Sequence, residues 1–242
     1  MSFSSADPTF SEERLLSLLA SCPLFSPLPE QALRQLAGVA RRRRYEAGEA
    51  LYRLGDPSDS VFLLCSGRVR ASIRSRDGRD LVLHVAVPGE APGYIDLIDE
   101  SPRTVNAVTQ GEVEVLVLPA RAVRASLLEH PRALMQLSAE LAGVVRQLAE
   151  AASDLVFLDL PARLAKLLLA RRAPDGRVEL GLTQSDLAAQ LGVARQSLNR
   201  TLGELQRHGL IRIEHSGTSV ELVDRMALRR LAMGDGGVLS QM

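Results

Sequence analysis

The sequence is poor in residues that define several protein classes: it has no tryptophan, two cysteines and 3% aromatic residues. Cys22 and Cys65 provide no disulfide framework, and they are too few for the four thiolates of an iron–sulfur cluster. No apolar run approaches the roughly 20 residues of a membrane-spanning helix. The N-terminus lacks the basic-then-apolar order of a signal peptide, and the histidines lack metal-ligand spacing. We therefore expect a cytoplasmic protein with no membrane segment, metal site or iron–sulfur cluster.

An excess of charge of either sign is missing as well, because 29 Lys+Arg balance 29 Asp+Glu. Among the 29 basic residues, Lys166 is the single lysine. A neutral total argues at first against nucleic acid as a partner, since DNA-binding domains usually carry a basic excess. The balance is uneven along the chain, however. Residues 1–159 hold 17 basic and 21 acidic residues, a balance of −4, whereas residues 160–242 hold 12 and 8, a balance of +4. The neutral total therefore conceals a basic C-terminal part that can face DNA.

Residues 45–118 contain short apolar or alternating runs separated by turn-forming residues. The runs at residues 61–64, 81–87 and 113–118 have the length and spacing of strands. Glycine, proline and aspartate occupy the turns between them, where glycine reaches positive φ without steric cost. The pattern predicts an all-β sandwich or barrel, and it follows short helices expected within residues 11–40.

A helical period replaces this pattern from about residue 131. Apolar residues recur at alternating spacings of three and four, which fills the a and d positions of about three heptads. These positions are Leu134, Leu137, Leu141, Val144, Leu148, Ala151 and Leu155. The helix would span roughly 37 Å at 1.5 Å per residue. It either packs on its own domain or forms the seam of a parallel homodimer, and the unbroken register favours the seam.

Residues 183–208 have the form of a helix-turn-helix. Thr183, followed three residues later by Asp186, predicts a capping box that starts the first helix. Gly192 permits a sharp turn, and the second helix runs from about Ala194 to His208 and stops at Gly209, a suitable residue for ending it. The hairpin pattern of residues 210–222 follows and predicts a wing.

The second of these helices has two contrasting faces. At about 100° per residue, its leucines fall on one side. The residues expected to contact DNA are Thr183 and, on the second helix, Arg195, Gln196, Ser197, Asn199 and Arg200. Arginine pairs with guanine, and glutamine or asparagine pairs with adenine. Any surface helix has a polar face, but these residues occupy the two turns that enter the major groove in a helix-turn-helix. The wing loop and Thr183 are placed to touch phosphates.

Over residues 22–230 the sequence resembles the CRP/FNR family of bacterial transcription regulators. The glycines that match the family's β-roll pattern are Gly48, Gly55, Gly67, Gly89 and Gly93. The resemblance implies an α+β fold, in which an N-terminal β-roll of the cyclic-nucleotide-binding type is followed by a long dimerisation helix and a C-terminal winged helix-turn-helix. The corresponding boundaries are residues 1–130, residues 131–158 with a hinge, residues 159–232, and a tail at residues 233–242.

The resemblance also implies a function. It predicts a homodimeric, non-enzymatic transcription regulator that binds a palindromic operator in double-stranded DNA and contacts RNA polymerase. On the recognition helix, both family arginines are present as Arg195 and Arg200, whereas Gln196 stands where the family usually has glutamate. This exchange predicts a changed base preference at one position, since glutamine favours adenine where glutamate accepts from cytosine.

The implied effector pocket departs further from the pattern of cyclic-AMP binders. Its residues would be Gly93, Tyr94, Ile95, Arg103, Thr104, Leu148 and Ala149. Tyr94 replaces the glutamate that binds the ribose, and Leu148 and Ala149 replace the hydroxyl residues that meet adenine. The arginine–hydroxyl pair that holds the phosphate is kept, although Asp96 nearby would repel an anion unless it faces elsewhere. We therefore expect that cyclic AMP is not the effector. Another nucleotide, another small ligand or effector-independent activity stays open.

Two other functional classes compete with a DNA-binding regulator. A cyclic-nucleotide-binding module that acts on a protein partner would explain the β-roll but leaves residues 183–222 without a purpose. An enzyme is disfavoured because the sequence has no nucleophile elbow, phosphate-binding loop, zinc motif or paired-carboxylate motif. Two roles are open: Cys22 is a reactive thiol or a core residue, and His84 is a haem ligand or an ordinary strand histidine.

Overall fold

The computed structural model describes residues 12–75, 80–171, 177–179, 183–214 and 219–235. It divides into two compact units, each of which is described by itself. The first unit contains Met1–Ile73 and Leu83–Val144, and the second contains Arg74–Val82 and Val145–Met242.

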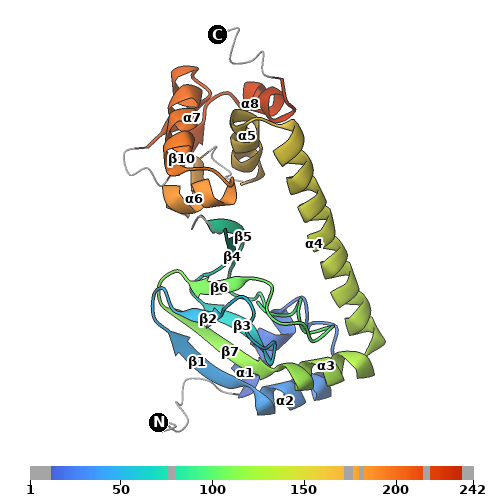
Figure 1. Ribbon diagram of the computed structural model, residues 1–242. Helices are drawn as coiled ribbons and strands as arrows, with labels where there is room; N and C mark the ends of the chain where they lie inside the picture. Colours follow the sequence, from blue (N-terminus) through green and yellow to red (C-terminus); the bar gives the residue numbers. More distant parts are fainter. Residues whose placement is uncertain (1–11, 76–79, 172–176, 180–182, 215–218, 236–242) are drawn as a thin grey trace. The chain divides into compact units, whose positions relative to one another are not determined.

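The first unit is a β-roll flanked by helices (Figure 1). Its helices are α1 (Glu12–Ser21), α2 (Glu30–Val39), α3 (Ala120–Glu129) and the first part of α4 (Pro131–Phe157). Its strands are β1 (Arg41–Tyr45), β2 (Ala50–Tyr52), β3 (Ser60–Ser66), β4 (Val69–Arg74), β5 (Asp80–Ala86), β6 (Asn106–Thr109) and β7 (Val113–Pro119). They form a sheet of order β1-β7-β3 and a sheet of order β2-β6-β4-β5. The last residue of β4 and the first residues of β5 fall within Arg74–Val82, which belongs to the second unit.

Strand β3 is apolar without interruption because both of its faces are covered. Val61 and Leu63 lie in a core shared with the helices, whereas Phe62 and Leu64 lie in the core between the two sheets. All four side chains are at most 5% exposed. Successive side chains of a strand point to opposite faces, so a strand between two cores reads as a continuous apolar run. The neighbouring β7 also has side chains in both cores, and Glu114 interrupts its apolar run.

Strand β1 lies at the edge of its sheet and carries the run Arg41–Tyr45, with four successive arginines. It pairs antiparallel with β7, so that Arg43 lies opposite Val115. Arg42 forms an ion pair with Glu114 of that neighbour. A charged edge resists pairing with a strand of another molecule, which gives these arginines a structural role.

The second unit holds the end of α4 and a small helical domain. Its other elements are α5 (Leu160–Ala170), β8 (Arg177–Glu179), α6 (Gln184–Gln190), α7 (Arg195–Arg207), β9 (Ile211–Ile213), β10 (Ser219–Leu222) and α8 (Arg225–Ala232). The strands form a sheet of order β8-β10-β9. Leucines from α5, α6, α7 and α8 share one core with the strands. The predicted α+β fold class, with a wing beside the helix-turn-helix, is confirmed.

The junction between α4 and α5 is held by side chains. Asp159 caps α5 by accepting a hydrogen bond from the Ala162 N–H at 3.0 Å. Lys166 of α5 reaches back to α4, where its Nζ lies 2.7 Å from Asp154 Oδ2 and 2.6 Å from Glu150 Oε1. Partial desolvation opposes the ammonium charge, but these two carboxylates outweigh it and raise the pKa of Lys166. The chain's single lysine therefore ties the two helices together at the point where their directions change.

We expect Gly67→Ala to destabilise the β-roll much more than Gly48→Ala. Both glycines have positive φ, +82° and +80°, so each substitution costs about 1 kcal/mol for the left-handed backbone. A Cβ at Gly67 would also lie 2.4 Å from Glu112 O, which is main chain, whereas Gly48 has nothing within 4 Å. The additional loss at Gly67 should be about 2 kcal/mol or more, measured by urea denaturation with circular dichroism. Equal losses would show that the backbone contact at Gly67 does not govern its stability.

Candidate nucleic-acid interface and effector site

Helix α6 begins with the capping box that the sequence predicts. Thr183 Oγ1 accepts a hydrogen bond from the Asp186 N–H at 3.1 Å. In return the Asp186 carboxylate accepts from the Thr183 hydroxyl at 2.8 Å and from its N–H at 3.3 Å. This reciprocal pair fixes the first turn of the helix. Because both donors of Thr183 are used, a phosphate at this position would have to share them with Asp186.

Glycines end both helices of the helix-turn-helix. Gly192 has a φ of +67°, and the next residue, Val193, donates its N–H to Ala188 O at 3.0 Å. Gly209 follows α7 with a φ of +66°. Glycine enters this left-handed region without the steric cost of a Cβ. The two stops set the length of α6 and α7 and hence the turn between them.

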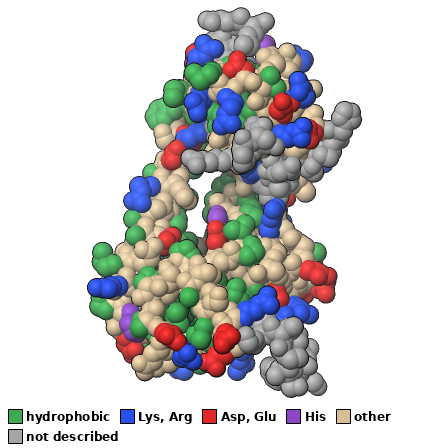
Figure 2. Space-filling model, turned by 180° about the vertical axis from the view of Figure 1, so that it is seen from behind, with side chains coloured by type: hydrophobic (Ala, Val, Ile, Leu, Met, Phe, Trp, Pro, Cys, Tyr) green, Lys and Arg blue, Asp and Glu red, His purple; other side chains and the backbone are tan. Residues whose placement is uncertain are grey.

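Helix α7 separates its residues into a buried and an exposed face. Leu198, Leu202 and Leu205 are at most 2% exposed and pack in the second unit's core. The predicted contacts Arg195, Gln196, Asn199 and Arg200 are all exposed, and Ser197 is half-buried. Arg195 makes a long hydrogen bond to Gln184 Oε1, at 3.5 Å. Figure 2 shows basic side chains, drawn in blue, on the surface of this unit. The base-contacting residues of the prediction thus share one accessible surface.

The wing is a hairpin of β9 and β10, in which Ile213 lies opposite Val220. Arg212 pairs across it with Glu221 at 2.5 Å. Arg177 of β8 lies 3.3 Å from Glu214. These pairs neutralise arginines on the body of the wing. The loop that the sequence predicts as a phosphate contact, residues 215–218, lies outside the described residues.

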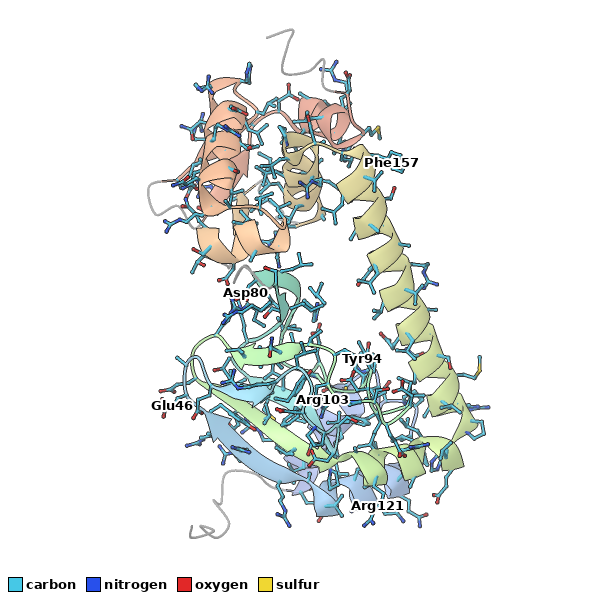
Figure 3. The ribbon with its side chains drawn as sticks, in the orientation of Figure 1. Glu46, Asp80, Tyr94, Arg103, Arg121 and Phe157 are labelled. Carbon is cyan, nitrogen blue, oxygen red and sulfur yellow. The ribbon has the colours of Figure 1, made fainter. Side chains whose placement is uncertain are left out.

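Arg103 lies inside the β-roll with 2% of its surface exposed, among the strands of the first unit in Figure 3. Its Nη1 donates to Gly93 O at 2.8 Å, and its Nη2 donates to Ser60 O. The guanidinium also lies over the ring of Tyr52, with 4.2 Å between Cζ and the ring centroid. Burial raises the pKa of Tyr52 to about 12, so the ring stays neutral beneath the cation. The cation–π contact is a favourable one for a desolvated guanidinium.

The counter-ion of this buried cation is Asp96. Its Oδ2 lies 3.5 Å from Arg103 Nη1, and its Oδ1 accepts a hydrogen bond from the Thr104 hydroxyl at 2.9 Å. Asp96 is 4% exposed. Asp96 therefore faces the arginine–hydroxyl pair directly. The sequence predicts repulsion of an anion by Asp96 but not the direction of its side chain, because a single loop residue carries no periodic signal.

Gly93 is required beside Arg103 by space as well as by backbone conformation. Its φ is +90°, and a Cβ there would lie 2.7 Å from Arg103 Nη1 and 3.3 Å from Ser60 O. Tyr94, at the position of the missing glutamate, is half-buried and packs against the first core. Ile95 is 46% exposed. Leu148 and Ala149 belong to the second unit, where both are exposed on α4.

The predicted dimer seam on α4 divides into a covered and an exposed part. Leu137 is 1% exposed in the core of the first unit, and Leu141 packs partly against that core. Leu148 and Leu155 are 53% and 58% exposed. The rest of the seam comprises the exposed Leu134 and Ala151 and the half-buried Val144. Leu137 is covered by its own domain, and the seam itself stays a prediction.

Cys22 and His84 lie in different environments, the first buried and the second exposed. Cys22 is 1% exposed, and burial raises the pKa of its thiol to about 11. It is a core residue and not a reactive thiolate. His84 Nε2 lies 2.6 Å from Glu90 Oε2. Among the described residues no cluster of histidine, cysteine, aspartate and glutamate could hold a metal, and no helix is long and apolar enough to cross a membrane.

Comparison with known proteins finds a matching family model in each of the two units. The family model for the cyclic nucleotide-binding domain matches residues 42–130, and the model for the Crp-like helix-turn-helix domain matches residues 162–231. A CRP-like cAMP-activated global transcriptional regulator of Mycobacterium tuberculosis is 29% identical over 88% of this chain and 98% of its own length. The cyclic AMP receptor protein of Thermus thermophilus is 29% identical over 88% of this chain and 97% of its own length. The solved structure of the c-di-GMP-responsive global regulator CLP of Xanthomonas campestris matches with a TM-score of 0.69 at 25% identity, over 81% of this chain and 100% of that one.

These likenesses define a DNA-binding transcription regulator with an effector-binding domain. The chain belongs to the CRP/FNR family, and it carries that family's cyclic nucleotide-binding domain and Crp-like helix-turn-helix. The family consists of regulators and not of enzymes, so the predicted family and the predicted non-enzymatic function are confirmed.

We expect His84 to titrate above its ordinary pKa of 6.5, because the hydrogen bond to Glu90 favours the imidazolium. Glu90→Gln should return the value toward 6.5, as followed by NMR of the imidazole resonances. Since the folded-state pKa is raised, the stabilisation is fully present below pH 6.5 and is lost as the pH rises through the folded value. Glu112→Gln removes an exposed carboxylate elsewhere in the β-roll and should leave the titration unchanged. An unshifted His84 in the unaltered protein would contradict the pairing.

Proposed function

We propose that the chain acts as a homodimer that binds a palindromic operator in double-stranded DNA through α7. The observation that carries this proposal is the division of α7 into a buried leucine face and an exposed face. On the exposed face, arginine, glutamine and asparagine occupy the first two turns. A recognition helix presents these turns to the base edges of the major groove.

The side chains of α7 indicate how bases would be read. Arg195 and Arg200 each offer a planar pair of donors that matches the O6 and N7 acceptors of guanine. Gln196 and Asn199 each offer an amide that pairs with adenine. Residues 160–242 have a balance of only +4, so phosphate contacts contribute modest affinity and base contacts carry a larger share of the binding.

The exposed end of α4 supports the dimer. Leu148, Ala151 and Leu155 repeat at heptad spacing on an exposed part of the helix. A second copy of the same helix would cover them in a symmetric interface, which buries the same patch on both subunits. Two recognition helices related by that symmetry would read the two halves of a palindrome.

The identity of the effector is open, and we expect it to bind in the β-roll. Cyclic AMP lacks two of its three expected determinants in this chain, at Tyr94 and at Leu148 with Ala149. Relatives of this chain are named for activation by cAMP and for response to c-di-GMP. A ligand or other signal would bias α4 and its junction with α5 between arrangements with different DNA affinity. The family assignment supports RNA polymerase as a further partner and the bacterial cytoplasm as the place of action.

We expect Arg195→Ala and Arg200→Ala each to weaken operator binding by about 1–3 kcal/mol and to relax the base preference at one position. The reason is the loss of a bidentate contact to guanine. The measurement is a gel shift on upstream regions of the protein's own genome, followed by a randomised-site selection for each variant.

The matched control is Arg207→Ala, which removes an exposed arginine from the C-terminal end of the same helix. It should lower the affinity for all sequences alike and leave the base preference intact, because it removes charge far from the first two turns. A uniform loss for Arg195→Ala and Arg200→Ala would contradict base reading. Absence of any palindromic site in the unaltered protein would overturn the proposed function.

We expect Leu148→Asp to dissociate the dimer. Two symmetric leucines would lose their burial, which amounts to about 3 kcal/mol or more and roughly a hundredfold in the dimer dissociation constant. Sedimentation velocity measures the mass directly, and operator affinity should fall with it. Ser153→Glu adds a charge about 140° away around the same helix and should leave the dimer intact. Dimers that persist in Leu148→Asp would place the interface elsewhere.

A further inference from the structure

The β-roll holds a buried anion-binding group that is already neutralised by the protein itself. Arg103 and Thr104 together present a guanidinium and a hydroxyl, which is a donor set suited to a phosphate. The anion on these donors is the carboxylate of Asp96. We propose that Asp96 is the specificity-determining residue of the effector domain: it acts as a built-in anion that excludes phosphate-bearing ligands from this site. This inference rests on the proposed function, because it concerns the effector of that regulator.

The hydrogen bonds of Arg103 leave little for a second anion. Nη1 is bonded to Gly93 O and lies beside Asp96, Nη2 is bonded to Ser60 O, and the guanidinium lies against Tyr52. Nε has no partner among the described residues. An incoming phosphate that bonds Nη1 or Nη2 would therefore have to compete with main-chain carbonyls or the carboxylate, and Nε is the donor that stays open to it.

Asp96 is held in this position by its own backbone. The adjacent Leu97 is 3% exposed in the core of the first unit, and its N–H donates to Tyr94 O at 3.3 Å. The Asp96 carbonyl accepts a hydrogen bond from the Ser58 hydroxyl at 3.4 Å. Turning the carboxylate outward would break its hydrogen bond from the Thr104 hydroxyl and would leave the buried Arg103 without a counter-ion. A buried charge without a partner is strongly destabilising.

Like charges add to this exclusion. Asp96 and Arg103 are 4% and 2% exposed. Solvent and salt therefore screen electrostatic interactions with these two charges only weakly. A phosphate ester brought to Arg103 would meet the Asp96 carboxylate at close range, where repulsion is stronger than in water. Removing the charge of Asp96 should therefore convert an excluded ligand into a stabilising one.

The experiment uses the full chain and four probes: inorganic phosphate, cyclic AMP, cyclic GMP and cyclic di-GMP. The variants are Asp96→Asn, which keeps the side-chain size, and Asp96→Gly, which opens the space. Thermal unfolding is recorded against probe concentration, because a ligand that binds only the folded state raises the Tm. Glu112→Gln, at an exposed carboxylate of the same unit, is the matched control.

The unaltered protein and Glu112→Gln should show no concentration-dependent rise in Tm with any probe. Asp96→Asn and Asp96→Gly should be less stable without a probe and should regain stability with phosphate or a cyclic nucleotide. The apparent affinity should increase by roughly tenfold or more over the unaltered protein. Adding Arg103→Met to Asp96→Asn should abolish the response. The proposal would be overturned if the unaltered protein binds a phosphate-bearing probe and Arg103→Met loses that binding. It would also be overturned if the Asp96 variants gain no anion binding.

A double-mutant cycle keeps the test decisive if Asp96→Gly does not fold. Asp96→Asn should cost much less stability in the Arg103→Met background than in the unaltered protein, because the cation that needs a counter-ion is gone. An equal cost in both backgrounds would overturn the role of Asp96. Operator binding by the unaltered protein is measured separately, so its absence would refute the proposed function while leaving the anion result to stand by itself.

Discussion

A buried guanidinium organises the β-roll. Arg103 connects the ring of Tyr52 on β2, the carbonyl of Ser60 at the start of β3 and the turn at Gly93. These segments are far apart in the sequence. Together they provide the contacts that a buried charge requires in place of solvent. The same requirement explains the neighbouring residues: Gly93 because a Cβ would touch Nη1, and Asp96 because the cation needs a counter-ion. An element that belongs to ligand recognition in the family is therefore also a structural element in this chain.

The sequence predicts the fold well where one period dominates. Strands β3 and β7 read as apolar runs, and both are covered on two faces. Thr183, Asp186, Gly192 and Gly209 predict the helix-turn-helix because caps and left-handed turns are local properties of the chain. Such features need no knowledge of distant contacts.

Local sequence patterns do not predict the environment of a side chain when several distant segments surround it. The heptad pattern assigns Leu137 and Leu148 to one seam, but the first is 1% exposed and the second is 53% exposed. A heptad register specifies the face of a helix and not what covers that face at each turn. Likewise, Asp96 could be read as a source of repulsion or as an outward-facing residue, and the contact with Arg103 that decides between them is tertiary. The roles of Ser60 and Tyr52 carried no sequence signal, because a main-chain carbonyl and a ring face have no motif.

The single lysine has a practical consequence. Lys166 joins α5 to Asp154 and Glu150 of α4, and the other 28 basic side chains are arginines, which amine-directed reagents do not modify. Such a reagent thus meets one side-chain amine in the whole sequence, located at the junction of the two helices. Acylation there would remove the charge that Asp154 and Glu150 pair with, so the reagent would test this junction without any substitution in the sequence.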